Sequence, residues 1–499
     1  MGEASLRELT QIVEDLASTG DDTVVPALQA LAAGDLYVEE STGAIVIQRG
    51  RTLLDPISGA EVSIADHDLS RIRVNNGLRN DISAALSSMT LMSDNPASRL
   101  SAARSLQANP DADNVALLDE AIAAETDPSV LSAMQTARAV TILDSDEASL
   151  EDKRAAVPVV TRNAGRDAIT ILAAARSGAP EELHPAIDAA LAGLEQERVF
   201  WGAMQNVWFG ISLGSVLLLA AIGLAITFGV MGVINMAHGE MVMLGAYTTF
   251  VVQLVIRQSF PGLLDYSLAI ALPAAFLVTA LIGIAIERGI IRWLYGRPLE
   301  TLLATWGLSL ILQQTVRSIF GPTNQMVIAP TWMSGAFAFY GLNITYSRLW
   351  IVGFAIAVFA LLLVVLNRSS LGLQMRAVTQ NRRMASAMGI RTPFVDAMTF
   401  GLGSGIAGLA GVALTQIDNV SPNLGQNYII DSFMVVVFGG VGNLWGTFVG
   451  AMTLGIANKF LEPYAGAVLG KILILILIIL FIQRRPRGLF ALKGRSVEA

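Results

Sequence analysis

The sequence lacks several side chains on which catalysis in soluble proteins often depends. Its 499 residues include no cysteine, which excludes disulfides, thiolate metal sites and a cysteine nucleophile. The three histidines, His67, His184 and His238, are too far apart for a metal-binding spacing such as H-x-x-x-H. The opening residues MGEASLRELTQ lack the apolar core of a signal peptide. We therefore expect neither a metal site nor a catalytic centre.

Known enzyme motifs such as H-E-x-x-H are also missing. GAVLGKIL (466–473) has the outline of a phosphate-binding loop, but it is one residue short between its glycines. Ile472 also stands where a Ser or Thr would bind Mg²⁺. Lys471 is interpreted as a lysine at a helix end that reaches the membrane surface. We expect no enzyme, no cofactor and no nucleic-acid partner.

Charge divides the chain near residue 200. The first 200 residues carry a net charge of −17 and the remainder +9, which together give the overall −8. The first part is acidic and of soluble character. The second consists of long apolar runs joined by basic connectors, as in a polytopic membrane protein.

The first 200 residues predict a mainly helical soluble domain. Short β-type runs broken by turns predict a small β element at 36–74. The Ala/Leu-rich region 78–197 contains two similar starts, NPASRL at 95 and DPSVLS at 127, and Val157-Pro158 suggests a third break. A period of about 30–45 residues predicts HEAT-like helix pairs, with ordinary helical hairpins as the alternative.

The second part predicts an all-α membrane domain of about eight or nine transmembrane helices at 205–490. The apolar runs lie at 207–230, 234–256, 267–287, 301–320, 347–367, 396–416, 428–441, 444–461 and 468–483. Arginine-rich connectors at 288–297 and 367–393, and the basic tail 483–495, mark the cytoplasmic side. With nine spans, residues 1–200 would be extracytoplasmic, although translocating them would need a signal sequence upstream.

Two glycine-broken stretches are candidates for a transport path. FGVMGVIN (228–235), which runs into GVINMAHGEMVMLGAY (232–247), and FGGVGNLW (438–445) each interrupt an apolar run. Unwound backbone in such segments can line a cavity, although glycines also permit close helix packing. Glu240 has the further alternative of an interfacial or capping carboxylate. The candidate path residues are Gly232, Asn235, His238, Glu240, Gly439, Gly442 and Asn443.

The loop at 368–392 is a candidate docking surface on the cytoplasmic side. Met375, Val378, Ala385 and Met388 recur at mixed spacings of three and four, as on an amphipathic helix that binds a partner's groove. A solvated basic linker is the alternative.

GVINMAHGEMVMLGAY and GLQMRAVTQNRRMASAMGI (372–390) resemble the permease subunits of branched-chain amino-acid ABC importers, over about 205–490. A long extracytoplasmic domain ahead of the permease is similar to the arrangement in the urea-type members. The resemblance implies an inverted-repeat importer fold in the bacterial cytoplasmic (inner) membrane. It also implies a second homologous permease, two cytosolic ATPase subunits and an extracytoplasmic solute-binding protein. The implied ATPase-coupling residues are Arg376, Thr379, Asn381, Arg382, Ala385, Gly389 and Ile390.

The expected function is a permease subunit for urea or short-chain amides. Branched-chain amino acids are the alternative solute. A secondary transporter or channel that uses Glu240 and His238 as a proton relay is a rival from another class. A membrane-tethered interaction protein with a functional N-terminal half is another.

Overall fold

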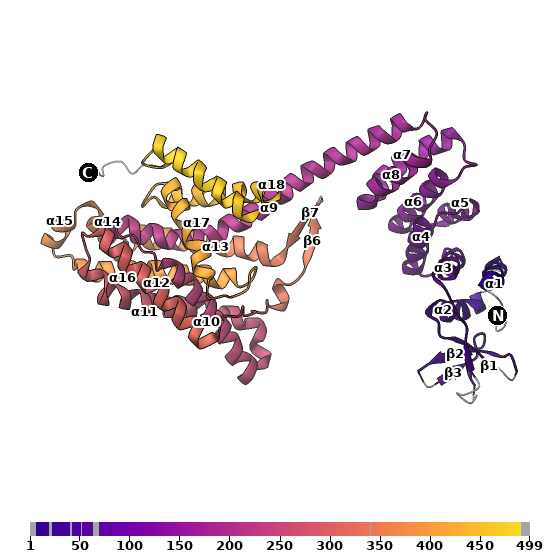
Figure 1. Cartoon of the computed structure of the whole chain (residues 1–499), viewed down its shortest axis with the longest axis horizontal. Coiled ribbons are helices and arrows are strands. Elements are labelled where there is room, and N and C mark those ends of the chain that lie inside the picture. Colours follow the sequence, from indigo (N-terminus) through magenta and orange to yellow (C-terminus); the bar gives the residue numbers. More distant parts are fainter. Residues whose placement is uncertain are drawn as a thin grey trace. The chain divides into compact units, whose positions relative to one another are not determined.

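The computed structural model describes residues 6–18, 22–39, 42–50, 52–62, 69–339 and 341–490, so the end of the basic tail lies outside the described residues. The chain forms two compact units, Met1–Val199 and Phe200–Ala499. We call them the amino-terminal unit and the membrane unit (Figure 1).

The amino-terminal unit begins with two helices and a small sheet, which lies in the region where the sequence predicted a β element. Ile47 of β2 pairs with both Leu36 and Leu54, and the buried side chains of Leu36 and Ile47 join one hydrophobic core. The sheet is antiparallel in the order β4-β3-β2-β1-β5. The elements are α1 (Leu6–Ser18), α2 (Val25–Ala33), β1 (Leu36–Glu39), β2 (Ile45–Arg49), β3 (Thr52–Leu54), β4 (Glu61–Val62) and β5 (Leu69–Arg71).

Six further helices follow in the amino-terminal unit, and two of them begin at the repeated motif. The side chains of Asn95 and Asp127 cap α4 and α6, with Pro96 and Pro128 at the first helical position. The expected third break is wrong, because Pro158 lies inside a helix. These helices are α3 (Asn76–Thr90), α4 (Pro96–Ala108), α5 (Asn114–Ala124), α6 (Pro128–Asp144), α7 (Leu150–Asn163) and α8 (Ala168–Gly178).

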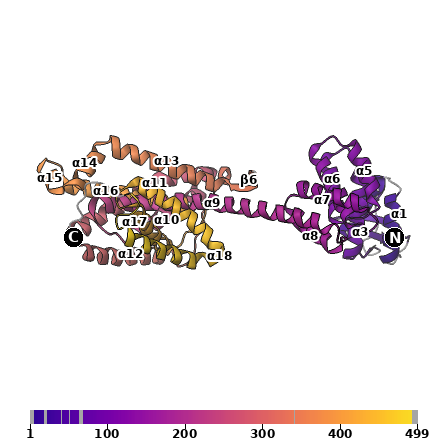
Figure 2. The same ribbon diagram turned by 90° about the horizontal axis from the view of Figure 1, so that it is seen from above.

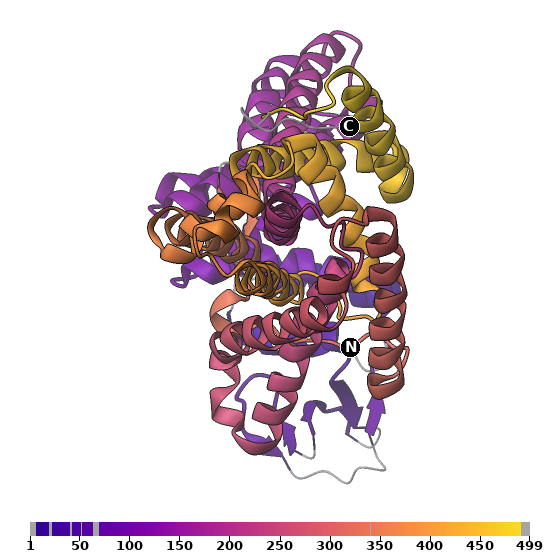
Figure 3. The same ribbon diagram turned by 90° about the vertical axis from the view of Figure 1, so that its left-hand side faces the viewer.

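The predicted span at 207–230 is the second half of a longer helix, α9 (His184–Met231). Residues 184–206 contain no proline after the first turn and are rich in Ala, Leu, Glu and Gln, so nothing ends the helix where polar residues give way to apolar ones. The boundary between the two units therefore falls within one helix. Figure 3 shows the membrane part of α9 nearly end-on, with other helices around it, and its apolar residues are mostly buried.

The membrane unit is a helical bundle, and six helices in the described residues are long and apolar enough to span a membrane. Two more, α12 and α17, are less apolar or shorter. α18 consists of two helical segments, which correspond to the predicted spans 444–461 and 468–483 and are joined by a kink where Gly466 is non-helical, with φ 73°. After α9 the helices are α10 (His238–Ser259), α11 (Ser267–Gly289), α12 (Pro298–Phe320), α13 (Tyr346–Arg368), α14 (Ser370–Gln380), α15 (Arg382–Ala387), α16 (Thr392–Leu414), α17 (Leu424–Gly439) and α18 (Leu444–Arg484).

Glycines allow α10, α11 and α16 to approach closely. A Cβ on Gly245 of α10 would lie 2.1 Å from the carbonyl oxygen of Gly408 in α16. A Cβ on Gly283 of α11 would lie 2.4 Å from Ser404 Oγ. In lipid, where no hydrophobic force drives helices together, such small-residue contacts supply the packing.

The membrane unit has two distinct ends, seen in Figures 1 and 2. At one end, α14 and α15 meet the connector that follows α11. There Arg382 of α15 stacks over Tyr295 of the connector. We call this the Arg-rich end. The other end carries an unpredicted hairpin, β6 (Ala336–Phe339) with β7 (Leu342–Thr345), and we call it the hairpin end. Gln205, near the start of the unit, bonds the backbone of Asn343 there.

Candidate functional site

The first glycine-broken stretch is a non-helical segment, 232–237, between α9 and α10. Gly232 adopts φ 69°, which turns the chain after α9, and the predicted span beginning at 234 starts instead at His238. Asn235 is buried and its Oδ1 accepts the Ala237 N–H at 3.0 Å. The Met236 N–H donates to Thr305 Oγ1 at 3.1 Å. The unwound backbone is therefore held by side chains, as buried polar groups in a membrane require.

His238 and Glu240 both lie in the first turn of α10, and both are 1% exposed. His238 Nε2 donates to the Ala220 carbonyl of α9 at 2.9 Å, and its Nδ1 has no partner among the described residues. Glu240 Oε1 accepts from Ser309 Oγ at 2.9 Å, whereas its Oε2 has no described partner. Glu240 is thus buried within the bundle, and one of its carboxylate oxygens is left without a described partner. No hydrogen bond in the described structure joins His238 to Glu240, which gives a proton relay between them no direct step.

A polar stripe on α12 faces this break, and the sequence analysis did not identify it. Thr305 contacts residues 234–236 and Ser309 holds Glu240. One turn further, Gln313 Nε2 donates to Asn423 Oδ1 at 3.0 Å. The stripe recurs every fourth residue, and this spacing was the available signal. Its members are Thr301, Thr305, Ser309, Gln313 and Arg317.

The second glycine-broken stretch is built differently. A Cβ on Gly439 would lie 2.3 Å from the carbonyl oxygen of Gly446, and Asn443 caps α18 by accepting the Gly446 N–H at 3.1 Å. Gly442 has φ 79°, and a Cβ on Gly229 would lie 2.6 Å from its Cα. The two stretches thus touch at Gly229 and Gly442, and the second has partners for its polar groups.

The loop at 368–392 folds as α14 and α15 with partly buried apolar residues. The Ala/Met stripe was expected to face a partner, but Met375, Val378 and Ala385 pack into the membrane unit's own core. Met384 and Met388 are exposed by 61% and 77%. The three buried side chains pack within the membrane unit because α14 and α15 lie against α13 and α16. Any apolar docking surface here is therefore smaller than the sequence indicated.

The polar residues of this loop shape its backbone. The Arg376 guanidinium donates to the Leu366 carbonyl, and Thr379 Oγ1 donates to the Met375 carbonyl at 2.8 Å. Asn381 caps α15 by accepting the Met384 N–H at 2.9 Å. After α15, Gly389 adopts φ 89°, and the Ile390 N–H closes the turn onto the Ala385 carbonyl at 3.1 Å.

Arg382 points inward, where an outward docking role was expected. It forms an ion pair with Asp396 of α16 and lies 4.5 Å from the ring centroid of Tyr295. Burial lowers the pKa of Arg382, but the hydrogen bond to Asp396 outweighs this and leaves that pKa above its usual value. An open cavity of about 430 Å³ lies beside it, lined by Val230, Met231, Tyr295, Gly296, Val378, Thr379 and Arg382. The end of α9 and the loop therefore share one cavity.

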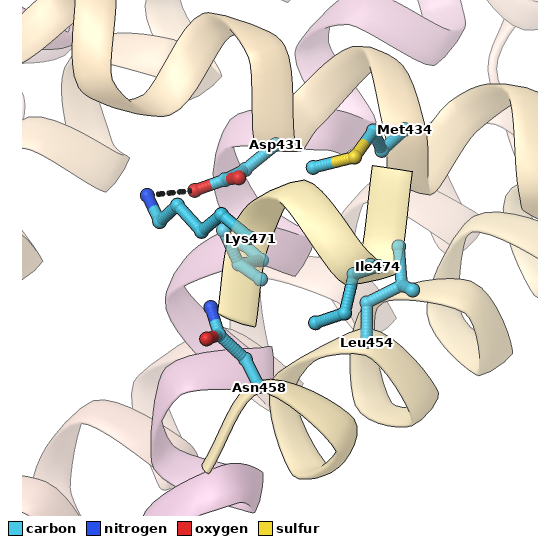
Figure 4. A pocket seen from close by; sticks show the side chains of 7 residues that line it. Asp431, Met434, Leu454, Asn458, Lys471 and Ile474 are labelled. Carbon is cyan, nitrogen blue, oxygen red and sulfur yellow. Dashed lines mark hydrogen bonds and ion pairs between the residues drawn. The ribbon is translucent and has the colours of Figure 1, made fainter. Parts of the chain in front are cut away.

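An ion pair joins α17 to α18 (Figure 4). Lys471 Nζ lies 2.7 Å from Asp431 Oδ2, beside a cavity of about 10 Å³ that Asn458 also lines. Such a space is close to the size of one water. Lys471, interpreted from the sequence as a lysine that reaches the membrane surface, has its ammonium paired with a carboxylate on the neighbouring helix.

Comparison with known proteins identifies the membrane unit. The family described as "Branched-chain amino acid transport system / permease component" matches residues 206–482. A high-affinity branched-chain amino acid transport system permease protein, BraD of Pseudomonas aeruginosa, is 30% identical over 293 residues, 57% of this chain and 95% of that protein. LivH of Escherichia coli, of the same description, is 30% identical over 295 residues, 57% of this chain and 94% of that protein.

A more limited similarity links the chain to the ribose import permease protein RbsC of Bacillus subtilis, with 30% identity over 111 residues, 21% of this chain and 34% of that protein. No solved structure matches the chain. The relatives are permease proteins of transport systems rather than enzymes, and together with the spanning helices they make this chain a multi-pass membrane protein. The family match covers more than half of the sequence, and the chain therefore belongs to the family of branched-chain amino acid transport permease components.

Proposed function

We propose that this chain forms a transmembrane path for branched-chain amino acids in an ATP-driven importer. The observation that carries the proposal is the break at 232–237, where buried polar groups of α10 meet the polar stripe of α12. Polar groups retained inside a membrane bundle usually serve a solute path. Asn235, His238, Glu240 and Gly232 would line it, while Gly439, Gly442 and Asn443 would hold the helices beside it.

The sequence favoured urea or short-chain amides, with branched-chain amino acids as the alternative. The relatives named above support the alternative, since their descriptions concern branched-chain amino acids. Urea transport therefore becomes a second arm of the test. The decisive assay is uptake of labelled leucine and labelled urea in cells that express the whole gene cluster, with and without this chain. Leucine uptake that persists without the chain would remove the proposal.

The chain would work with a second homologous permease, two cytosolic ATPases and an extracytoplasmic solute-binding protein. The sequence of this chain shows no nucleotide-binding motif. The ATPases of the assembly would therefore supply the energy for transport. The loop 368–392 would receive ATP-driven motion through its exposed face, including Met384 and Met388. The shared cavity supports this route, because it joins the loop to the end of α9.

The Arg-rich end would face the cytoplasm, in accord with the positive-inside rule. The contact of Gln205 with the hairpin end supports an extracytoplasmic location for residues 1–200. A reporter fused near Gly193, with a signal sequence supplied, should then read as extracytoplasmic. A cytoplasmic signal from that fusion would reverse the orientation.

A further inference from the structure

The polar stripe of α12 ends in a cluster of amides around one arginine. Arg317 Nη2 donates to Asn423 Oδ1 at 2.9 Å, and Gln313 Nε2 donates to the same oxygen at 3.0 Å. Gln426 Nε2 lies 3.4 Å from Gln313 Oε1. Arg317 and Gln313 are one turn apart on α12. Because both donate to Asn423 Oδ1, the guanidinium lies beside the Gln313 amide. The cluster therefore gathers several N–H donors at one point.

No ion pair neutralises Arg317 within the described residues, and the only negative charge that its position offers is the partial charge at the carbonyl end of α12. No Asp or Glu carboxylate in the described chain lies within 4 Å of Arg317, and the half-buried residue leaves its Nε buried without a hydrogen bond. A guanidinium carries five N–H donors in a planar fork, and one hydrogen bond to an amide oxygen uses few of them. By contrast, Arg382 at the Arg-rich end has its own carboxylate, Asp396. Arg317 is thus a cation with free donor capacity.

Helix ends add to the positive potential here. Asn423 immediately precedes α17, and a Cβ on Gly425 would lie 2.5 Å from the carbonyl oxygen of Gly239 in α10. The amino-terminal turns of two interrupted helices therefore meet beside the cluster. Backbone N–H groups at such ends favour anions, and interrupted helices in transporters direct them at anionic solute groups.

The cluster also lies in line with the proposed path. Ser309, which holds Glu240, precedes Gln313 by four residues on the same face of α12, about 6 Å along the helix. Arg317 belongs to the last turn, next to the segment that leads to the hairpin end. A solute that enters from that end would meet the arginine before it reaches Glu240.

We propose that Arg317, with Gln313, Asn423 and Gln426, binds the carboxylate of the solute as it enters the membrane unit from the hairpin end. The inference rests on the proposed function, because it requires a solute that carries a carboxylate. Arginine binds a carboxylate through two parallel hydrogen bonds between opposite charges. A neutral solute such as urea cannot form such an ion pair. The cluster would therefore separate amino acids from neutral amides inside the membrane unit.

The first test uses the complete importer reconstituted in vesicles, with saturating leucine-loaded binding protein. Arg317→Gln should lower the initial rate of leucine uptake by about tenfold or more, the size expected when a charge-assisted hydrogen bond is lost. Arg317→Lys keeps the charge and should retain an intermediate rate. Arg257→Gln, at an exposed arginine in the last turn of α10, is the matched control and should change the rate less than about twofold.

The second test needs no transport. Phenylglyoxal modifies accessible arginines, and mass spectrometry of the wild-type complex can follow Arg317 and Arg257 separately. Leucine should slow modification of Arg317, leucinamide should not, and neither should affect Arg257. If wild-type vesicles take up no leucine, the proposed function falls and this inference with it. If leucine uptake is normal in Arg317→Gln and leucine gives no protection, the inference alone is overturned, and Arg317 is an arginine that reaches the membrane surface.

Discussion

The two glycine-broken stretches of the membrane unit are similar in sequence, but their polar groups are arranged differently. At 232–237 the break leaves polar groups with unused hydrogen-bonding capacity, namely Glu240 Oε2 and His238 Nδ1. At 440–443 the side chain of Asn443 caps α18, and Gly439 packs against Gly446 with no room for a side chain. The comparison teaches that a broken helix indicates a solute path only when the polar groups beside it have no other hydrogen-bond partner.

The largest expected effect concerns packing at the second break. Gly439→Leu should prevent assembly, because its Cβ would overlap the Gly446 backbone, which cannot move aside as a side chain could. Folded yield after detergent extraction, measured by size-exclusion chromatography, should fall to near zero. Gly353→Leu, in α13 with open space at its Cβ position, is the control and should give normal yield. A well-folded Gly439→Leu protein would contradict the packing role.

The next effect concerns the first break. Glu240→Gln should keep the hydrogen bond from Ser309 but remove the charge, so leucine uptake should drop by about tenfold or more while thermal stability in detergent changes little. Glu300→Gln, at an exposed acid in the first turn of α12, is the matched control and should leave uptake within about twofold. Unchanged uptake in Glu240→Gln would reduce the first break to a packing feature like the second.

A smaller effect should follow from filling the cavity at the end of α9. This cavity adjoins the first break and not the second. Thr379→Trp places a large ring in the space of about 430 Å³ between the loop and the end of α9, so it should slow uptake several-fold without loss of folded protein. A tryptophan at the exposed Thr315 of α12 serves as control. Equal rates in the two variants would show that motion at this cavity does not limit transport.

The smallest effect should come from the cap at the second break. Asn443→Ala removes one hydrogen bond to the start of α18, which costs about 1 kcal/mol for a typical cap. The melting temperature in detergent should fall slightly, while the uptake rate per folded molecule should stay at the wild-type value. A selective loss of uptake at unchanged stability would place Asn443 on the solute path after all.

Much of the membrane unit could be predicted from sequence, because apolar length is a direct signal of spanning helices. The spans at 267–287 and 347–367 fall within α11 and α13. The predicted span at 301–320 also falls within α12, but the polar stripe of that helix was overlooked. An apolar run indicates a spanning helix, whereas the partners of the polar residues within it lie on other segments of the chain.

Contacts between distant segments could not be predicted. The inward turn of Arg382 depends on Asp396 and on Tyr295. The pairing of Lys471 with Asp431 joins residues 40 positions apart. Local pattern describes which residue types are present, whereas the direction of a long charged side chain is decided by whatever carboxylate the tertiary fold brings near it.

The residues after α18 bear on the order in which the protein matures. The Leu489 and Phe490 N–H groups donate to the Phe438 and Gly439 carbonyls at 2.9 and 3.1 Å, where α17 ends. Carbonyls at the end of a helix have no partner within that helix. Since a chain emerges from the ribosome amino end first, α17 must wait about fifty residues of synthesis for these two hydrogen bonds. The end of α17 is therefore completed only when the last residues of the membrane unit have been made.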